Sequence, residues 1–82
     1  MINKDEFIKS VDELGYSLDY DMPNQTCFIV NNKGEALVLI SYDYHFGRSY
    51  NLYPSFEKLG KYYQIKLDEL IIETDFSFLI SR

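Results

Sequence analysis

The run from Ala36 to Ile40 is the feature that most limits how this chain can fold. Its five consecutive residues are all apolar, whereas a strand with one solvated face alternates apolar and polar side chains. The run is also far shorter than the roughly 20 residues that span a bilayer. We therefore predict a central β-strand that is either covered on both faces, or covered on one face and used in an interface on the other.

The N-terminal segment carries the signals of an amphipathic helix. Asn3 and Glu6 have the spacing of a capping box. The apolar residues that follow recur on one helical face: Phe7, Ile8, Val11 and Leu14. Gly15 comes next and suits the left-handed conformation that ends many helices. A helix from about Asn3 to Leu14 is predicted.

The middle of the chain reads as strands separated by turn residues. Alternating or β-rich segments predict strands at residues 16–21, 27–30, 35–46 and 49–53. The predicted connections are a loop at Met22–Gln25, a hairpin turn at Asn31–Gly34 and a turn at Gly47–Arg48. Consecutive strands joined in this way form an antiparallel sheet.

The C-terminal part returns to helical spacing. Pro54 opens it, and we predict a short helical turn near residues 55–60 and a main helix near 64–74. Phe76–Ile80 is too apolar for a free tail and is expected to dock. The fold class is therefore α+β, with residues 1–82 forming a single domain. Its three- to four-stranded antiparallel sheet is flanked by an N-terminal and a C-terminal helix, both packed on the sheet.

Charge argues against direct binding of nucleic acid. Thirteen acids against eight Lys and Arg give a net charge of −5, which is the wrong sign for a generic phosphate-binding surface. Residues 1–22 contain six acids and only two bases, Lys4 and Lys9. A single cysteine and an N-terminus without the pattern of a secretory signal predict a cytoplasmic protein that does not enter a membrane.

Candidate chemical groups are few. Cys27 and His45 are the only residues of their types, so a zinc site of His and Cys within one chain lacks about half of its ligands. Cys27 opens an apolar strand and is expected to be buried and inert. His45 lies near Asp43, Tyr44 and Arg48 but has no second histidine or nucleophile motif beside it, so it is expected to be solvated or to contact a partner. The adjacent acids Asp12–Glu13 and Asp68–Glu69 point about 100° apart on a helix. We expect no catalytic residue, metal or cofactor, and no enzyme.

Two groups of residues are candidates for binding a partner. The first is the acidic array of the N-terminal part: Asp5, Glu6, Asp12, Glu13, Asp19 and Asp21. It could imitate the phosphates of a nucleic acid, or simply keep the helix soluble. The second is the aromatic set Tyr42, Tyr44 and Phe46, which strand alternation places on one face. It could pack in the core or form a protein-binding patch.

Several segments resemble small uncharacterised proteins of Gram-positive phages: residues 5–16, 28–34, 56–59 and 67–73, together with Arg82. In length, acidity and layout the chain is also similar to type II-A anti-CRISPR proteins, which are acidic α+β inhibitors that resemble DNA to a Cas nuclease. The resemblance implies a phage protein in the host cytoplasm that inhibits a host defence protein with a basic surface. The acidic array would contact Lys and Arg of that partner.

An alternative function remains open from the same residues. The chain could be a non-enzymatic structural or assembly protein of a phage or prophage that works as a homodimer. Its interface would then be the aromatic sheet face together with Phe76–Ile80. Tyrosine and phenylalanine are common at such interfaces.

Overall fold

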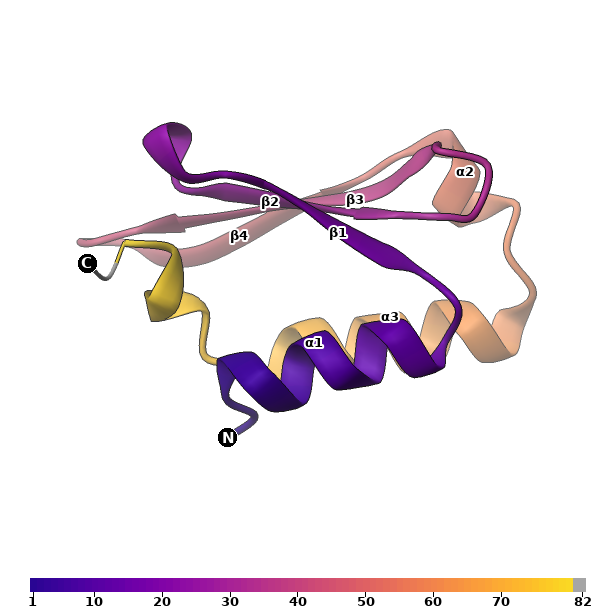
Figure 1. Cartoon of the computed structure of the whole chain (residues 1–82), viewed down its shortest axis with the longest axis horizontal. Coiled ribbons are helices and arrows are strands. Elements are labelled where there is room, and N and C mark those ends of the chain that lie inside the picture. The colour runs from indigo at the N-terminus through magenta and orange to yellow at the C-terminus, as the bar shows by residue number, and fades with distance from the viewer. Residues whose placement is uncertain (81–82) are drawn as a thin grey trace.

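The computed structural model describes residues 1–80, and Arg82 lies outside the described residues. Four strands form one antiparallel sheet in the order of the chain: β1 (Ser17–Asp21), β2 (Thr26–Val30), β3 (Ala36–Asp43) and β4 (Gly47–Leu52). The two long helices are α1 (Lys4–Glu13) and α3 (Lys61–Glu73), and both lie on the same face of the sheet (Figure 1). The predicted α+β class, with helices at both ends of a four-stranded antiparallel sheet, is confirmed.

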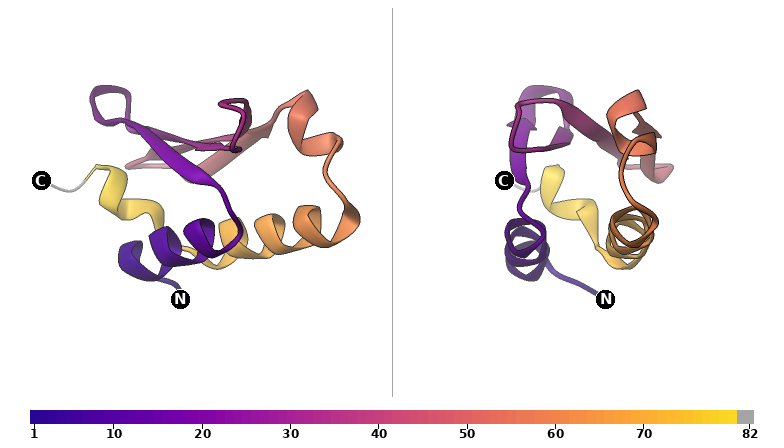
Figure 2. Two further views of the ribbon diagram at one scale, coloured as in Figure 1. Left: turned by 45° about the vertical axis from the view of Figure 1, so that its right-hand side comes forward. Right: turned by 90° about the vertical axis from the view of Figure 1, so that its right-hand side faces the viewer.

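The two long helices lie side by side and run in opposite directions. Figure 2 shows α1 beneath the β1 side of the sheet and α3 beneath the β4 side. The ends of these helices are tied by the backbone of Ile2. Its N–H donates to the carbonyl oxygen of Glu73 at 2.8 Å, and its own carbonyl accepts from the N–H of Asp75 at 2.9 Å. This connection fixes the spacing of the helices at one end.

The predicted start of α1 is confirmed in detail. The Asn3 side chain accepts a hydrogen bond from the backbone N–H of Glu6 at 2.9 Å, and the Glu6 carboxylate accepts one from the backbone N–H of Asn3 at 3.3 Å. Both donors would otherwise lack an intrahelical partner. Leu14 is the C-cap, and Gly15 follows with φ of 89°. The helix therefore begins and ends as its sequence predicts.

The predicted extension of the third strand to Phe46 is wrong. β3 ends at Asp43, whose carboxylate accepts hydrogen bonds from the backbone N–H of His45 at 2.8 Å and of Phe46 at 2.9 Å. The chain then enters β4 at Gly47 with φ of 78°, a conformation that favours glycine. A three-residue turn that closes on a left-handed glycine is a common hairpin connection. Gly47 thus ends the turn and does not begin one.

Three short helical segments complete the chain. They are η1 (Met22–Asn24), within the predicted loop, α2 (Pro54–Glu57) and η2 (Phe76–Leu79). The helix α3 starts at Lys61, three residues before the predicted start at 64. The side-chain amide of Gln64 donates to the carbonyls of Glu57 at 3.2 Å and Leu59 at 3.0 Å. It thereby joins the end of α2 to the first turn of α3.

The core lies between the sheet and the layer formed by α1, α3 and η2. Its fully buried side chains include Phe7, Val11, Cys27, Ile29, Val38, Ile40, Leu67, Ile71, Phe76 and Leu79. Phe7 and Phe76 meet edge to face, with ring centroids 5.0 Å apart. The predicted docking of Phe76–Ile80 is confirmed. Because Phe76 and Leu79 are buried in their own chain, they cannot also serve as the dimer surface suggested by the sequence.

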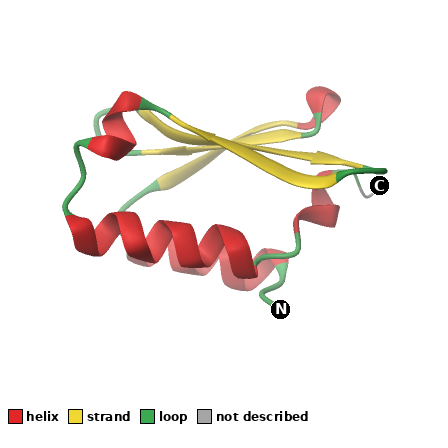
Figure 3. Cartoon of the chain, turned by 180° about the vertical axis from the view of Figure 1, so that it is seen from behind, coloured by secondary structure: helices red, strands yellow, loops and turns green. Residues whose placement is uncertain are grey.

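The apolar run at the start of β3 is covered unequally on its two faces. The helices cover the face on which Val38 and Ile40 are buried. On the other face α2 packs against one end of β3, and Leu39 lies half-buried opposite Phe28 of β2. Figure 3, seen from behind, shows the same one-sided layering among the described residues. Leu37 alternates with Val38 and is also fully buried, so the start of the run is covered on both faces, whereas Leu39 is only half-buried.

Candidate protein-binding groove

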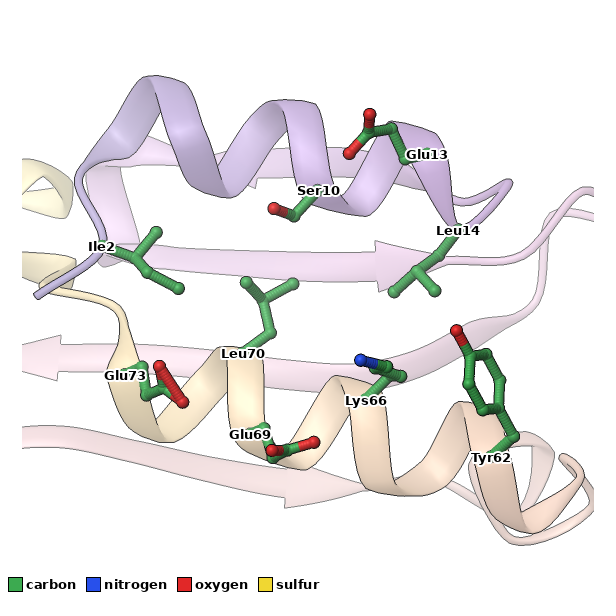
Figure 4. A pocket seen from close by; sticks show the side chains of 9 residues that line it. All are labelled: Ile2, Ser10, Glu13, Leu14, Tyr62, Lys66, Glu69, Leu70 and Glu73. Carbon is green, nitrogen blue, oxygen red and sulfur yellow. The ribbon is translucent and has the colours of Figure 1, made fainter.

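A groove of about 400 Å³ runs between α1 and α3. Figure 4 looks into it with the sheet behind, and shows Ile2, Leu14 and Leu70 pointing into the space between the helices. The remaining lining residues come from both helices: Ser10 and Glu13 from α1, and Tyr62, Lys66, Glu69 and Glu73 from α3. The groove therefore has an apolar floor and polar walls.

The walls of the groove are predominantly acidic. Glu13, Glu69 and Glu73 are exposed carboxylates, and Lys66 is the one base among the nine lining residues, so the lining carries a net charge of −2. Glu6 adds a further carboxylate, because it lines an adjoining hollow that shares Ile2 and Glu73 with the groove. Acids from two separate parts of the chain thus meet across one depression.

Helical spacing explains why these side chains gather. On α3, Tyr62, Lys66, Glu69 and Glu73 follow at intervals of four, three and four residues, so they form one stripe along the helix. On α1, Glu6, Ser10 and Glu13 follow at four and three. Both stripes border the same depression, because the helices lie side by side on one face of the sheet.

Lys66 lies toward one end of the groove. Its Nζ is 5.7 Å from the centroid of the Tyr62 ring, within the range of a cation–π contact. Figure 4 shows Tyr62 at the end opposite Glu73. The positive charge and the aromatic ring therefore mark one end, and the carboxylates of Glu73 and neighbouring Glu6 mark the other.

The six acids predicted as one array occupy three places. Glu6 and Glu13 lie on the groove side of α1. Asp12 lines a separate hollow between α1 and β1, and Asp5 lies seven residues before it, on the same side of the helix. The acids of β1 alternate with Leu18 and Tyr20, which line that hollow, so Asp19 and Asp21 point to the other face of the sheet. The structure thus divides the array and brings Glu13 together with acids of α3.

The predicted aromatic set is also divided. Tyr42 belongs to β3 and packs half-buried against the core. Tyr44 and Phe46 lie in the turn after it and are strongly exposed, with the His45 ring between them in edge contact with both. The prediction that all three share a strand face is wrong, because the strand ends at Asp43. Tyr44 and Phe46 form an exposed tip and not a sheet surface.

The candidate chemical groups sit where their reactivity is low. Cys27 is fully buried, and burial, with the charge of Asp19 as a second cause, raises the pKa of its thiol to about 12. The Asp43 carboxylate accepts hydrogen bonds from the backbone N–H groups of Phe46 and His45 in the turn, and these bonds lower its pKa. Among residues 1–80, no group of three or more His, Cys, Asp and Glu side chains is placed to hold a metal ion.

Adjacent acids on the helices diverge as predicted. Asp12 faces the hollow beside β1 while Glu13 faces the groove. Asp68 accepts a hydrogen bond from the Tyr50 hydroxyl of β4 at 3.3 Å, while Glu69 faces the groove. Neither pair forms a shared two-carboxylate site.

Sequence reasoning did not identify the contribution of α3 to the groove. The sequence favours a solvated helix surface for Asp68–Glu69, assigns Leu70 only to the apolar spacing of the helix, and does not mark Tyr62, Lys66 or Glu73 as site residues. The available signal was the spacing of Glu69 and Glu73 on the side of the helix next to Leu70. That spacing alone does not say that a second acidic helix lies opposite.

Comparisons with known proteins gave no match: no protein-family model, no curated protein and no solved structure corresponds to this chain. Within residues 1–80, no helix has both the length and the apolar character needed to cross a membrane.

Proposed function

We propose that this chain is a non-catalytic inhibitor that binds a basic, nucleic-acid-binding surface of a host defence protein. Its acidic helix α1 and the groove beside it provide the contact. The proposed partner is a Cas nuclease, the class of protein that is inhibited by the anti-CRISPR proteins that the sequence resembles. The partner's Lys and Arg side chains would take the place of counter-ions around the carboxylates.

The observation that carries this proposal is the meeting of acids across the groove. Glu13 of α1 and Glu69 and Glu73 of α3 line one depression, and Glu6 adjoins it. Carboxylates seven residues apart on one helix are about 10 Å apart, and the facing helix adds a second row. Two rows of negative charge on either side of a depression are a suitable target for cationic side chains that normally hold phosphates.

The apolar floor of the groove adds a hydrophobic contribution to binding that charge alone does not provide. Ile2 and Leu14 are half-buried, and Leu70 is nearly buried, at the bottom of the groove. A partner side chain that reaches them would be removed from water while its cationic end stays near the rim. Long Lys and Arg side chains do this readily, because their stems are apolar and their heads are charged.

The test is inhibition of DNA cleavage by the effector nuclease of a type II-A CRISPR system. The variant carries Asp5→Lys, Asp12→Lys and Glu13→Lys, with Glu6→Gln, which keeps an acceptor for the Asn3 N–H in the capping box. We expect the wild-type chain to inhibit at a stoichiometric ratio and the variant to lose inhibition. The variant's far-ultraviolet circular dichroism should be unchanged, since these side chains are exposed.

The control is Glu57→Lys, an exposed acid on α2 that lies outside the groove. It should inhibit like the wild-type chain. Inhibition that survives in the four-residue variant would exclude the acidic surface as the contact. A wild-type chain that does not inhibit would exclude this class of target.

The second candidate is a non-enzymatic structural or assembly protein of a phage or prophage that functions as a homodimer. Burial of Phe76 and Leu79 removes the tail as its interface. What favours this candidate is an unpaired sheet edge with exposed apolar side chains at β4. Analytical ultracentrifugation combined with the inhibition assay tests this candidate: a strict monomer that inhibits the nuclease would exclude it.

A further inference from the structure

Within residues 1–80, no strand pairs with the outer edge of β4. β4 pairs with β3 on one side, and the order of the four strands places it at the end of the sheet. The backbone N–H of Tyr53 donates to the carbonyl of Leu37 in β3 at 3.0 Å. Backbone direction alternates along an antiparallel strand, so the N–H and C=O groups of Arg48, Tyr50 and Leu52 point away from β3. They form a row of main-chain donors and acceptors that another strand can use.

Protection of the two sheet edges differs. Edge strands are usually guarded by charged side chains, proline or bulges. Two of the five residues of the edge strand β1 are charged, Asp19 and Asp21. β4 contains neither proline nor a shift of register, and its one charged residue is Arg48. The Arg48 guanidinium is engaged elsewhere: it donates to the carbonyl of Ile72 at 3.0 Å and contacts that of Thr74 at 3.4 Å.

An exposed apolar band lies next to this open edge. Its members are Tyr50 and Leu52 of β4 and Ile65 and Ile72 of α3, each between 37% and 50% exposed. Two hydrogen bonds place this side of α3 beside β4. The Tyr50 hydroxyl donates to Asp68, which lies between the two isoleucines on the helix. The Arg48 guanidinium donates to the backbone carbonyl of Ile72. Ile65 and Ile72 are seven residues apart and lie on one side of α3. The band therefore belongs to the same side of the molecule as the edge.

We propose that β4 pairs with β4 of a second copy of this chain. Only residues whose backbone groups point outward can be hydrogen-bonded partners, and the symmetric register that uses all three of them places Tyr50 opposite the partner's Tyr50 and Arg48 opposite the partner's Leu52. The pairing is antiparallel and two-fold symmetric, so the same surface serves both copies. It joins two four-stranded sheets into one of eight strands and brings the two α3 helices together across the axis.

The distribution of charge allows a second copy to bind at this edge and not at the other. The chain carries a net charge of −5, and two identical acidic surfaces repel each other. Most acids of the N-terminal part lie on α1 and β1, at the opposite edge of the sheet (Figure 2). Next to the apolar band, Arg48 and Asp68 balance one another. Pairing through β4 buries the apolar side chains of both copies while keeping their α1 helices apart.

This inference goes beyond the proposed inhibition, and its test leaves the acidic residues unchanged. Sedimentation equilibrium of the wild-type chain should give twice the 9.7 kDa mass of the monomer. Leu52→Lys and Ile72→Lys each place an ammonium group in the interface, and each should raise the dimer dissociation constant at least about tenfold. The control is Ile8→Lys on α1, a similarly exposed side chain outside the band, which should leave the dimer intact.

Cysteine cross-linking tests the register. In a hydrogen-bonded antiparallel pair the Cα atoms are about 5.5 Å apart, which a disulfide can span. Tyr50→Cys should therefore form a disulfide-linked dimer under mild oxidation. Tyr20→Cys is the matched control, because Tyr20 lies on the other edge strand with the same 37% exposure as Tyr50, and it should remain unlinked. A wild-type chain that is monomeric at about 0.1 mM would overturn the proposal. So would a dimer that Leu52→Lys does not weaken, or a disulfide-linked dimer of the Tyr20→Cys variant.

Discussion

Truncation of Phe76 tests how much of the stability depends on the docked C-terminal segment. Phe76 is 1% exposed and meets Phe7 edge to face at 5.0 Å. Replacing a buried phenylalanine by alanine costs about 3–5 kcal/mol, which includes the cavity it leaves. A chain of this length has roughly 4–12 kcal/mol of stability in total. Phe76→Ala should therefore remove about a quarter or more of the free energy of unfolding.

The assay is urea denaturation followed by circular dichroism. With an m-value of about 2 kcal/mol/M, the midpoint should fall by roughly 1.5–2.5 M. Phe46→Ala is the matched control: it removes the same side chain from a position that is 91% exposed, where substitutions usually change stability by less than about 0.5 kcal/mol. If Phe76→Ala unfolds at the same urea concentration as Phe46→Ala, the segment is not docked as described.

Three further predictions concern the cap, the thiol and the turn. Asn3→Ala removes the side-chain oxygen that accepts from the Glu6 N–H at the start of α1 and should lower the free energy of unfolding measured with urea by about 1 kcal/mol; an unchanged midpoint would contradict the capping role. Because burial raises the pKa of Cys27 to about 12, its thiol should react with a disulfide reagent at pH 8 only after unfolding, and rapid reaction of the native chain would show that it is accessible. Asp43 has a lowered pKa in the fold because Phe46 and His45 donate to it, so its contribution to stability is present above the unfolded pKa of about 3.9 and is lost as the pH falls through the lower folded value. Thermal melts should thus show a smaller acid-induced loss in Asp43→Ala, and an identical acid limb would refute this.

Local signals predicted the elements better than their junctions. The Asn3 cap and Gly15 define α1 because both act within a few residues. The β3–β4 turn was misplaced because glycine can open or close a turn, and only the hydrogen bonds accepted by Asp43 show that Gly47 closes it. The start of α3 was placed too late because its first turn is supported by Gln64 reaching back to α2, a contact without a periodic signature.

The candidate groove depends on tertiary structure in a way that no local pattern reports. The sequence identified the acids of α1, including Glu13, as a possible contact. It could not pair Glu13 with Glu69 and Glu73, since that pairing requires α1 and α3 to lie on the same face of the sheet. The same limit applies to the band beside β4, because Ile65 and Ile72 lie near Tyr50 only through the fold.

The most direct test of the proposed function compares two double variants as inhibitors of the type II-A effector nuclease. Glu13→Lys with Glu69→Lys reverses acids in the groove, and Asp5→Lys with Asp12→Lys reverses acids on the other side of α1. Each replacement adds two positive charges, so both variants move the net charge from −5 to −1. We predict that the groove variant loses inhibition while the other retains most of it. Equal inhibition by the two variants would contradict binding through the groove.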